Sequence, residues 1–209
     1  MAPRSLRIAL AGLLGTFAVG CGGESDSTTS TTDAVMTSTA EDAVAPLDLD
    51  QYLLHVDEGP GLEPLSSPQT ESGEPFPLPE GGAEMLERSG YISMTYQTGR
   101  GDSIAGVSSV LAFETEAGAR DWMTYETSDE VLRHELPDGK FTWFRVPDVP
   151  GASGWTGPDL HGNAIGNVYW TQGRCMMLIS IETGGPRVEL LSAGAQAIFE
   201  RTGGTCPDE

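Results

Sequence analysis

Residues 164–183 read AIGNVYWTQGRCMMLISIET, and this stretch decides the fold class. It holds two apolar runs, 164–171 and 174–181, rich in β-branched, aromatic and methionine side chains. The connection between them is the dipeptide Gln172-Gly173. Two such runs around a short glycine-containing connection are typical of an antiparallel hairpin.

A second hairpin is predicted nearer the N-terminus. Apolar and small polar residues alternate over 91–97 and again over 107–113, and the turn sequence Gly-Arg-Gly-Asp lies between them at 99–102. Alternation with a period of two indicates half-buried strands. A helix capped by Thr115 should follow and reach Leu136 after one break.

The rest of the C-terminal part predicts one more strand and one more helix. A strand is expected over 141–146, a Gly/Pro loop over 147–157, and a helix from Pro186 that ends at Gly203. The Pro-rich segment 66–82 is expected to lack regular structure.

Together these patterns predict an α+β fold, an antiparallel sheet of about five strands with helices packed on one face. We expect a single domain over residues 45–209.

The first twenty residues have the pattern of a secretory signal. Arg4 and Arg7 precede an uncharged apolar stretch, 8–19, and a small residue, Gly20. The stretch is shorter than the roughly 20 residues that a membrane-spanning helix needs. We therefore expect residues 1–20 to be a signal peptide and the rest of the chain to be exported.

The end of this signal predicts a lipid anchor. The tetrapeptide Ala18-Val19-Gly20-Cys21 resembles the bacterial lipobox, in which the cysteine is acylated after cleavage. The resemblance implies that Cys21 carries the lipid and that the protein faces the periplasm or the cell exterior. Residues 21–44 are rich in Ser and Thr and predict a disordered tether. The alternative is an ordinary signal peptide with a chance cysteine.

The charge of the chain excludes several classes of partner. It has 31 acidic and 11 basic residues, a net charge of −20, and loss of Arg4 and Arg7 with the signal makes it more acidic. Such a surface repels phosphate backbones and anionic lipid heads. We expect no nucleic-acid partner, and contact with the membrane only through the lipid on Cys21.

The sequence shows no motif for catalysis or for a metal. His55, His134 and His161 are isolated from one another, and there is no zinc motif, nucleophile elbow, P-loop or dinucleotide fingerprint. We therefore predict a protein that is not an enzyme and holds no metal or cofactor.

Two cysteines remain for the folded part, Cys175 and Cys206. An even number of cysteines in an exported chain predicts a disulfide. Cys175 shares a strand face with Met177 and Ile179, and Cys206 follows the helix that should cover this face, so the pairing is geometrically reasonable. The alternative is a catalytic thiol.

Aromatic residues give the leading candidate ligand site, and the Pro-rich loop between Ser66 and Gly82 is the alternative location. Tyr169 and Trp170 are neighbours on one strand and must point to opposite faces of the sheet. With helices on one face only, one of the two is exposed, and we expect it to form a binding surface with Trp155 of the Gly/Pro loop. The alternative is that a helix or loop covers it.

Three segments carry a family resemblance: the turn Leu49-x-x-x-Leu53-Leu54-x-x-Asp57 before Gly-Pro-Gly, residues 113–122, and residues 167–176. They resemble uncharacterised bacterial lipoproteins and the extracytoplasmic sensor domains attached to some membrane kinases. The resemblance implies a lipid-anchored binding or sensing module without catalytic activity, and names no ligand. Two other functions are kept open, a secreted hydrolase with an unrecognised carboxylate site and an envelope module that binds other proteins.

Overall fold

A computed structural model of the protein describes most residues from 47 onward. The described residues are 47–55, 58, 63–64, 66–73, 75, 78, 81–102, 104–136, 140–158, 162–183, 185 and 187–207. The predicted signal peptide, the predicted tether and Cys21 lie outside them. No helix within these residues is long and apolar enough to cross a membrane.

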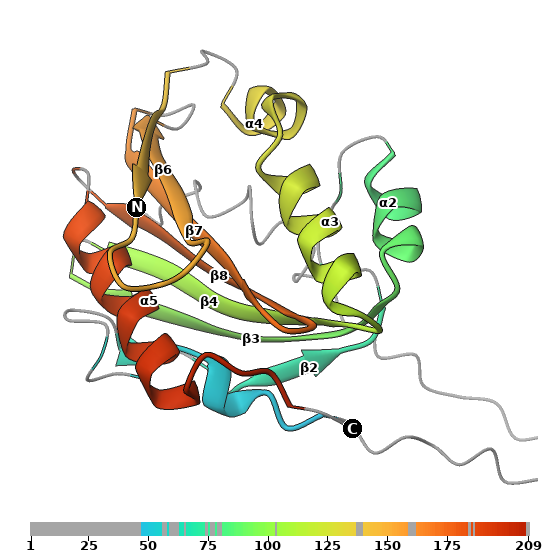
Figure 1. Ribbon diagram of the computed structural model, residues 1–209. Coiled ribbons are helices and arrows are strands. Elements are labelled where there is room, and N and C mark those ends of the chain that lie inside the picture. Colours follow the sequence, from blue (N-terminus) through green and yellow to red (C-terminus); the bar gives the residue numbers. More distant parts are fainter. Residues whose placement is uncertain are drawn as a thin grey trace, which may run out of the picture.

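An antiparallel sheet of eight strands forms the centre of the described structure (Figure 1). Seven strands follow one another in the order β1-β3-β4-β8-β7-β6-β5, and β2 also pairs with β3. The strands are β1 (Glu63–Pro64), β2 (Gln69–Glu71), β3 (Tyr91–Gly101), β4 (Ile104–Phe113), β5 (Thr142–Arg145), β6 (Ser153–Pro158), β7 (Ala164–Gln172) and β8 (Cys175–Thr183).

Within the described residues, four α-helices and one 3-10 turn accompany the sheet. They are η1 (Asp50–Tyr52), α2 (Gly82–Arg88), α3 (Glu116–Glu126), α4 (Asp129–Glu135) and α5 (Val188–Thr202). The α3 helix begins at Thr115, whose side chain accepts a hydrogen bond from Gly118 N, and α5 ends at Gly203 in the left-handed conformation. Both ends lie where the sequence predicts them.

Both predicted hairpins are confirmed. In the first, β3 pairs with β4 from Tyr91 opposite Phe113 to Gly101 opposite Ile104. In the second, β7 pairs with β8, and Gln172 lies opposite Cys175. The two hairpins join because β4 also pairs with β8.

The predicted number of about five strands is too low. The additional strands are β1, β2 and β6, and two of them lie in segments expected to be loops: β2 in the Pro-rich segment 66–82 and β6 in the segment 147–157. The glycines of 147–157 favoured a loop in the sequence-based prediction, but Gly154 lies within β6. It is needed there because the neighbouring strands pack closely against it. A Cβ atom at Gly154 would lie 2.4 Å from Phe144 Cζ and 2.5 Å from Asn167 O.

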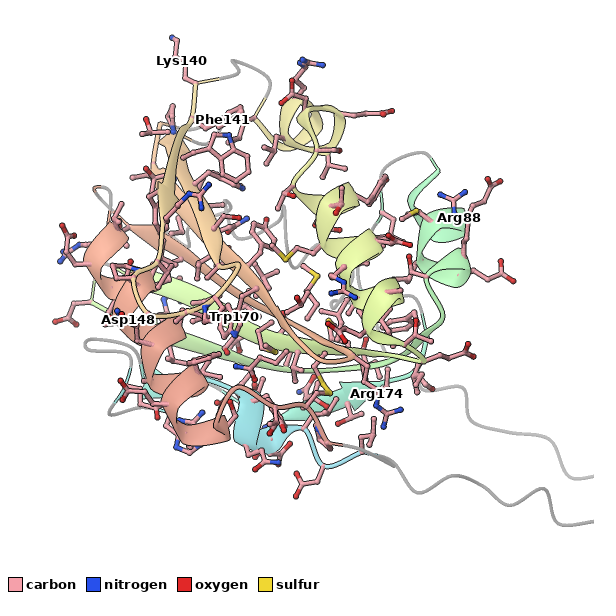
Figure 2. All side chains as sticks on the ribbon, in the orientation of Figure 1. Arg88, Lys140, Phe141, Asp148, Trp170 and Arg174 are labelled. Carbon is pink, nitrogen blue, oxygen red and sulfur yellow. A yellow bond between two sulfur atoms is a disulfide. The ribbon has the colours of Figure 1, made fainter. Side chains whose placement is uncertain are left out.

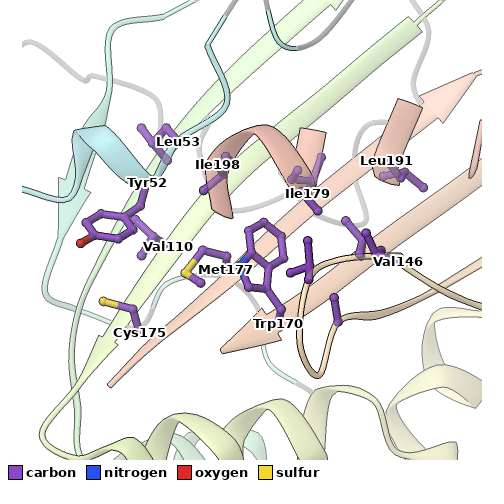
Figure 3. Close-up of a cluster of buried hydrophobic side chains, with 14 of the residues drawn as sticks. Tyr52, Leu53, Val110, Val146, Trp170, Cys175, Met177, Ile179, Leu191 and Ile198 are labelled. Atoms are coloured by element: carbon purple, nitrogen blue, oxygen red, sulfur yellow. The ribbon is translucent and has the colours of Figure 1, made fainter. Parts of the chain in front are cut away.

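The prediction that helices cover one face of the sheet is wrong. Alternate residues of the same strands enter two separate buried clusters, so Val168 and Trp170 pack with α5 and η1, whereas Tyr169 packs with α2, α3 and α4. Figure 1 shows α5 on one side of the sheet and the α2–α4 group on the other. The cluster on the α5 side surrounds Trp170 (Figure 3). Because each face has its own apolar cover, both faces are buried.

Candidate functional site

The predicted disulfide joins β8 to the segment that follows α5. Cys175 and Cys206 are bonded, with 5.6 Å between their Cα atoms, and both are buried in the α5-side cluster. The pairing is thus confirmed, and neither sulfur is available as the catalytic thiol of the alternative hypothesis.

The predicted aromatic surface does not form. The side chains of Trp155, Tyr169 and Trp170 are at most 1% exposed. The expectation that either Tyr169 or Trp170 is exposed is therefore wrong. The physical reason is the second layer of helices, which covers the face that the sequence-based fold left open. As placed here, these three side chains offer no surface to a ligand.

Trp170 belongs to the α5-side core. Its indole N–H has an internal acceptor, since the Gln172 amide oxygen lies 3.2 Å away when the amide is oriented to satisfy its neighbours. A buried tryptophan whose N–H is satisfied within the protein is a packing residue.

Trp155 and Tyr169 lie on the other face, in a region with several unsatisfied polar atoms. Trp155 is directly opposite Asn167 across β6 and β7, and Asn167 Nδ2 donates to Tyr169 Oη at 2.8 Å. Trp155 Nε1 and Asn167 Oδ1 are buried without a hydrogen-bond partner among the described residues. Trp122 Nε1 and Tyr125 Oη, both from α3, are buried and unpartnered in the same sense. We call these four side chains (Trp122, Tyr125, Trp155 and Asn167) the α3-side polar group.

The α3-side polar group has the chemistry of a hydrogen-bonding site. Two indole N–H groups can only donate, a phenol can do both, and the amide oxygen can accept. Burial raises the pKa of Tyr125, and the neighbouring carboxylates of Glu126 and Glu130 raise it further, so the phenol keeps its proton at neutral pH. Buried polar atoms of this kind are usually satisfied by ordered water.

Among the described residues, Glu126 is the only buried carboxylate. No three His, Cys, Asp or Glu residues within the described ranges lie together as a metal site would require. His55 is exposed, and the side chains of His134 and His161 lie outside the described residues.

A cavity of about 590 Å³ lies at the end of the sheet, beside β5. Its lining comes from the segment 143–153, and includes Trp143, Arg145, Val149 and Ser153. Trp143 is 44% exposed and is the one large apolar side chain so exposed among the described residues. The volume falls within the roughly 300–1,000 Å³ of small-molecule sites. This cavity is the candidate ligand site within the described residues, because Trp122, Trp155 and Asn167 of the α3-side polar group are buried.

Sequence reasoning missed Trp143 and Arg145, although a usable signal was present. Both residues lie in the predicted strand 141–146 at positions that share a face, and Arg145 marks that face as exposed. It also missed Trp122 and Asn167, for which single-sequence patterns carry no signal, because a polar atom's lack of a partner depends on the tertiary packing.

The described residues therefore define an α+β domain whose antiparallel sheet is buried on both faces. No protein-family model and no curated protein sequence matches the chain. Among solved structures, it is similar to the extracellular domain of PknH from Mycobacterium tuberculosis, with a TM-score of 0.52 and 16% sequence identity. The match covers 73% of this chain and 93% of that domain, and shows a shared fold. A putative uncharacterized protein from Mycobacterium smegmatis matches at a TM-score of 0.37 and 13% identity, over 69% of this chain and 96% of that one.

Proposed function

We propose that this protein is an extracytoplasmic binding or sensing module, tethered to a bacterial membrane by a lipid on Cys21 and without catalytic activity of its own. The observation that carries the proposal is the fold shared with the extracellular domain of PknH. The structural match covers 93% of that domain.

The location outside the cytoplasm has two further supports in this chain. One is the signal and lipobox pattern that ends at Cys21. The other is the Cys175–Cys206 disulfide, because structural disulfides persist in oxidising compartments and are rare in the reducing cytoplasm. Both supports are independent of the fold comparison.

The binding role is supported by the cavity beside β5, whose lining combines an exposed tryptophan with an arginine. Apolar and aromatic side chains with a few polar groups are typical of ligand sites.

Membrane anchoring is tested by the variant Cys21→Ser. The wild-type protein, expressed in a bacterial host, is expected in the membrane fraction and in the detergent phase after phase separation. The variant is expected to leave the membrane fraction, because it lacks the thiol that accepts the lipid. Immunoblots of the two fractions give the measurement.

The matched control is Cys206→Ser, which removes another cysteine but leaves Cys21 in place. This control should stay with the membrane. Equal partition of wild type and Cys21→Ser would contradict the lipid tether.

A further inference from the structure

The β5 strand is an uncovered edge of the sheet within the described residues. It pairs with β6 through Thr142–Arg145 and with no other strand there. In an antiparallel pair, alternate residues point their backbone N–H and C=O groups away from the partner strand. Two of the four residues of β5 therefore present unpaired backbone groups to a further strand.

The side chains on this edge give it a recognition pattern. Trp143 and Arg145 are two residues apart, so they share one face of β5 and are separated by roughly 7 Å along the strand. Phe141 packs edge-to-face against Trp143 at 5.8 Å between ring centroids and supports the indole. Arg145 is exposed, and no carboxylate forms an ion pair with it among the described residues.

The strand β5 itself carries one charge, the positive charge of Arg145. The segment 138–159 around it has two basic residues, Lys140 and Arg145, and three acidic residues, Asp138, Asp148 and Asp159, in a chain whose net charge is −20. Figure 2 shows Lys140 at one end of this region and Asp148 in the loop at the other. The charge that the strand itself offers to a ligand is therefore that of Arg145, which complements a carboxylate.

The loop beside the edge is held in place by the core. Val146, Val149 and Ala152 are buried in the α5-side cluster, and Gln196 of α5 donates from Nε2 to Pro147 O at 2.9 Å. Because these contacts fix the loop, the wall of the cavity beside β5 is formed before any ligand arrives. Such preorganisation lowers the entropic cost of binding.

We infer that the exposed edge of β5 binds a segment of a partner protein that adds to the sheet as an extended strand and carries an acidic side chain. The acidic residue pairs with Arg145, and an apolar residue two positions away contacts Trp143 and enters the cavity. Backbone hydrogen bonds to β5 supply affinity, and these two side chains supply selectivity. This inference rests on the proposed function and names the kind of partner that the module takes.

The test is a selection of random linear peptides on the full mature protein purified in detergent. Enriched peptides should contain an acidic residue two positions from an apolar or aromatic one. Enrichment of acidic peptides would distinguish specific binding from nonspecific attraction, because a protein of net charge −20 attracts basic peptides nonspecifically. A fluorescently labelled consensus peptide then gives Kd by anisotropy.

Variants and modified peptides decide the mode of binding. Arg145→Gln and Trp143→Ala should each weaken the consensus peptide about tenfold, as should Asp→Asn or Glu→Gln in the peptide. N-methylation of alternate peptide nitrogens should abolish binding, because it removes the donors of an added strand. The matched control is Arg133→Gln, since Arg133 is exposed on α4 and already paired with Asp129 at 2.9 Å. It should leave Kd unchanged.

Several results would overturn the inference. They are the absence of any enriched peptide, enrichment of basic peptides only, and binding that is insensitive to Arg145→Gln or to N-methylation. Free glutamate that competes with the peptide at equal affinity would show a small-molecule carboxylate site and overturn the added strand. Membrane fractionation of Cys21→Ser tests the proposed function separately, so the two failures are distinguishable.

Discussion

Replacing either Tyr169 or Trp170 with alanine is expected to lower the free energy of unfolding by roughly 3–5 kcal/mol. The two side chains are neighbours on β7 and point to opposite faces, yet both are buried, at 1% and 0% exposure. Each variant leaves a cavity in a different cluster, because Tyr169 packs under α3 and Trp170 packs under α5. Denaturant unfolding followed by circular dichroism measures both values.

The matched control is Trp143→Ala, the same loss of an indole at a position that is 44% exposed. It should cost less than about 1 kcal/mol, because large effects require a buried cavity. A sheet covered on one face only would make one of the two β7 variants nearly neutral. That result would contradict the two-sided packing described above.

Loss of the Cys175–Cys206 disulfide is expected to destabilise the protein by roughly 3.5 kcal/mol, the chain-entropy value for a closed loop of about 30 residues. The bond spans a sequence separation of 31 and ties the end of α5 to β8. For a domain of about 160 residues this corresponds to a melting temperature lower by roughly 7–14 °C. Calorimetry of Cys206→Ser in the absence of reductant gives the shift.

Reductant provides the internal control for this prediction. Dithiothreitol should lower the melting temperature of the wild-type protein by about as much as the substitution does, and should leave Cys206→Ser unchanged. Two thiols that react with an alkylating reagent in the native, unreduced protein would show that the bond is absent.

The elements with strong local signals could be predicted from sequence. Both hairpins have period-two alternation, and the start of α3 and the end of α5 have a capping threonine and a C-terminal glycine. The β6 strand could not be predicted in this way, because its glycines and proline are typical of a loop. The need for glycine at 154 arises only when Phe144 and Asn167 lie on the strands at either side.

The candidate sites depended more strongly on tertiary structure. Because neighbouring residues of a strand point to opposite faces, the sequence correctly placed Tyr169 and Trp170 on opposite faces of the sheet. This alternation does not tell whether other elements cover a face. The covering helices, α2 to α4, precede β7 in the sequence and are separated from it by β5 and β6. The side of the sheet on which they pack depends on the tertiary structure. For this reason the exposed tryptophan is Trp143, at the edge of the sheet, and not an aromatic residue of β7.

The most direct test of the central proposal is the intact mass of the wild-type protein extracted from membranes. We expect a mature chain that begins at Cys21 and exceeds its polypeptide mass by a diacylglyceryl group, with or without a third acyl chain. Tandem mass spectrometry should place this added mass on the N-terminal residue. A mature chain with an unmodified N-terminus, at Cys21 or beyond it, would show that the protein has no lipid tether.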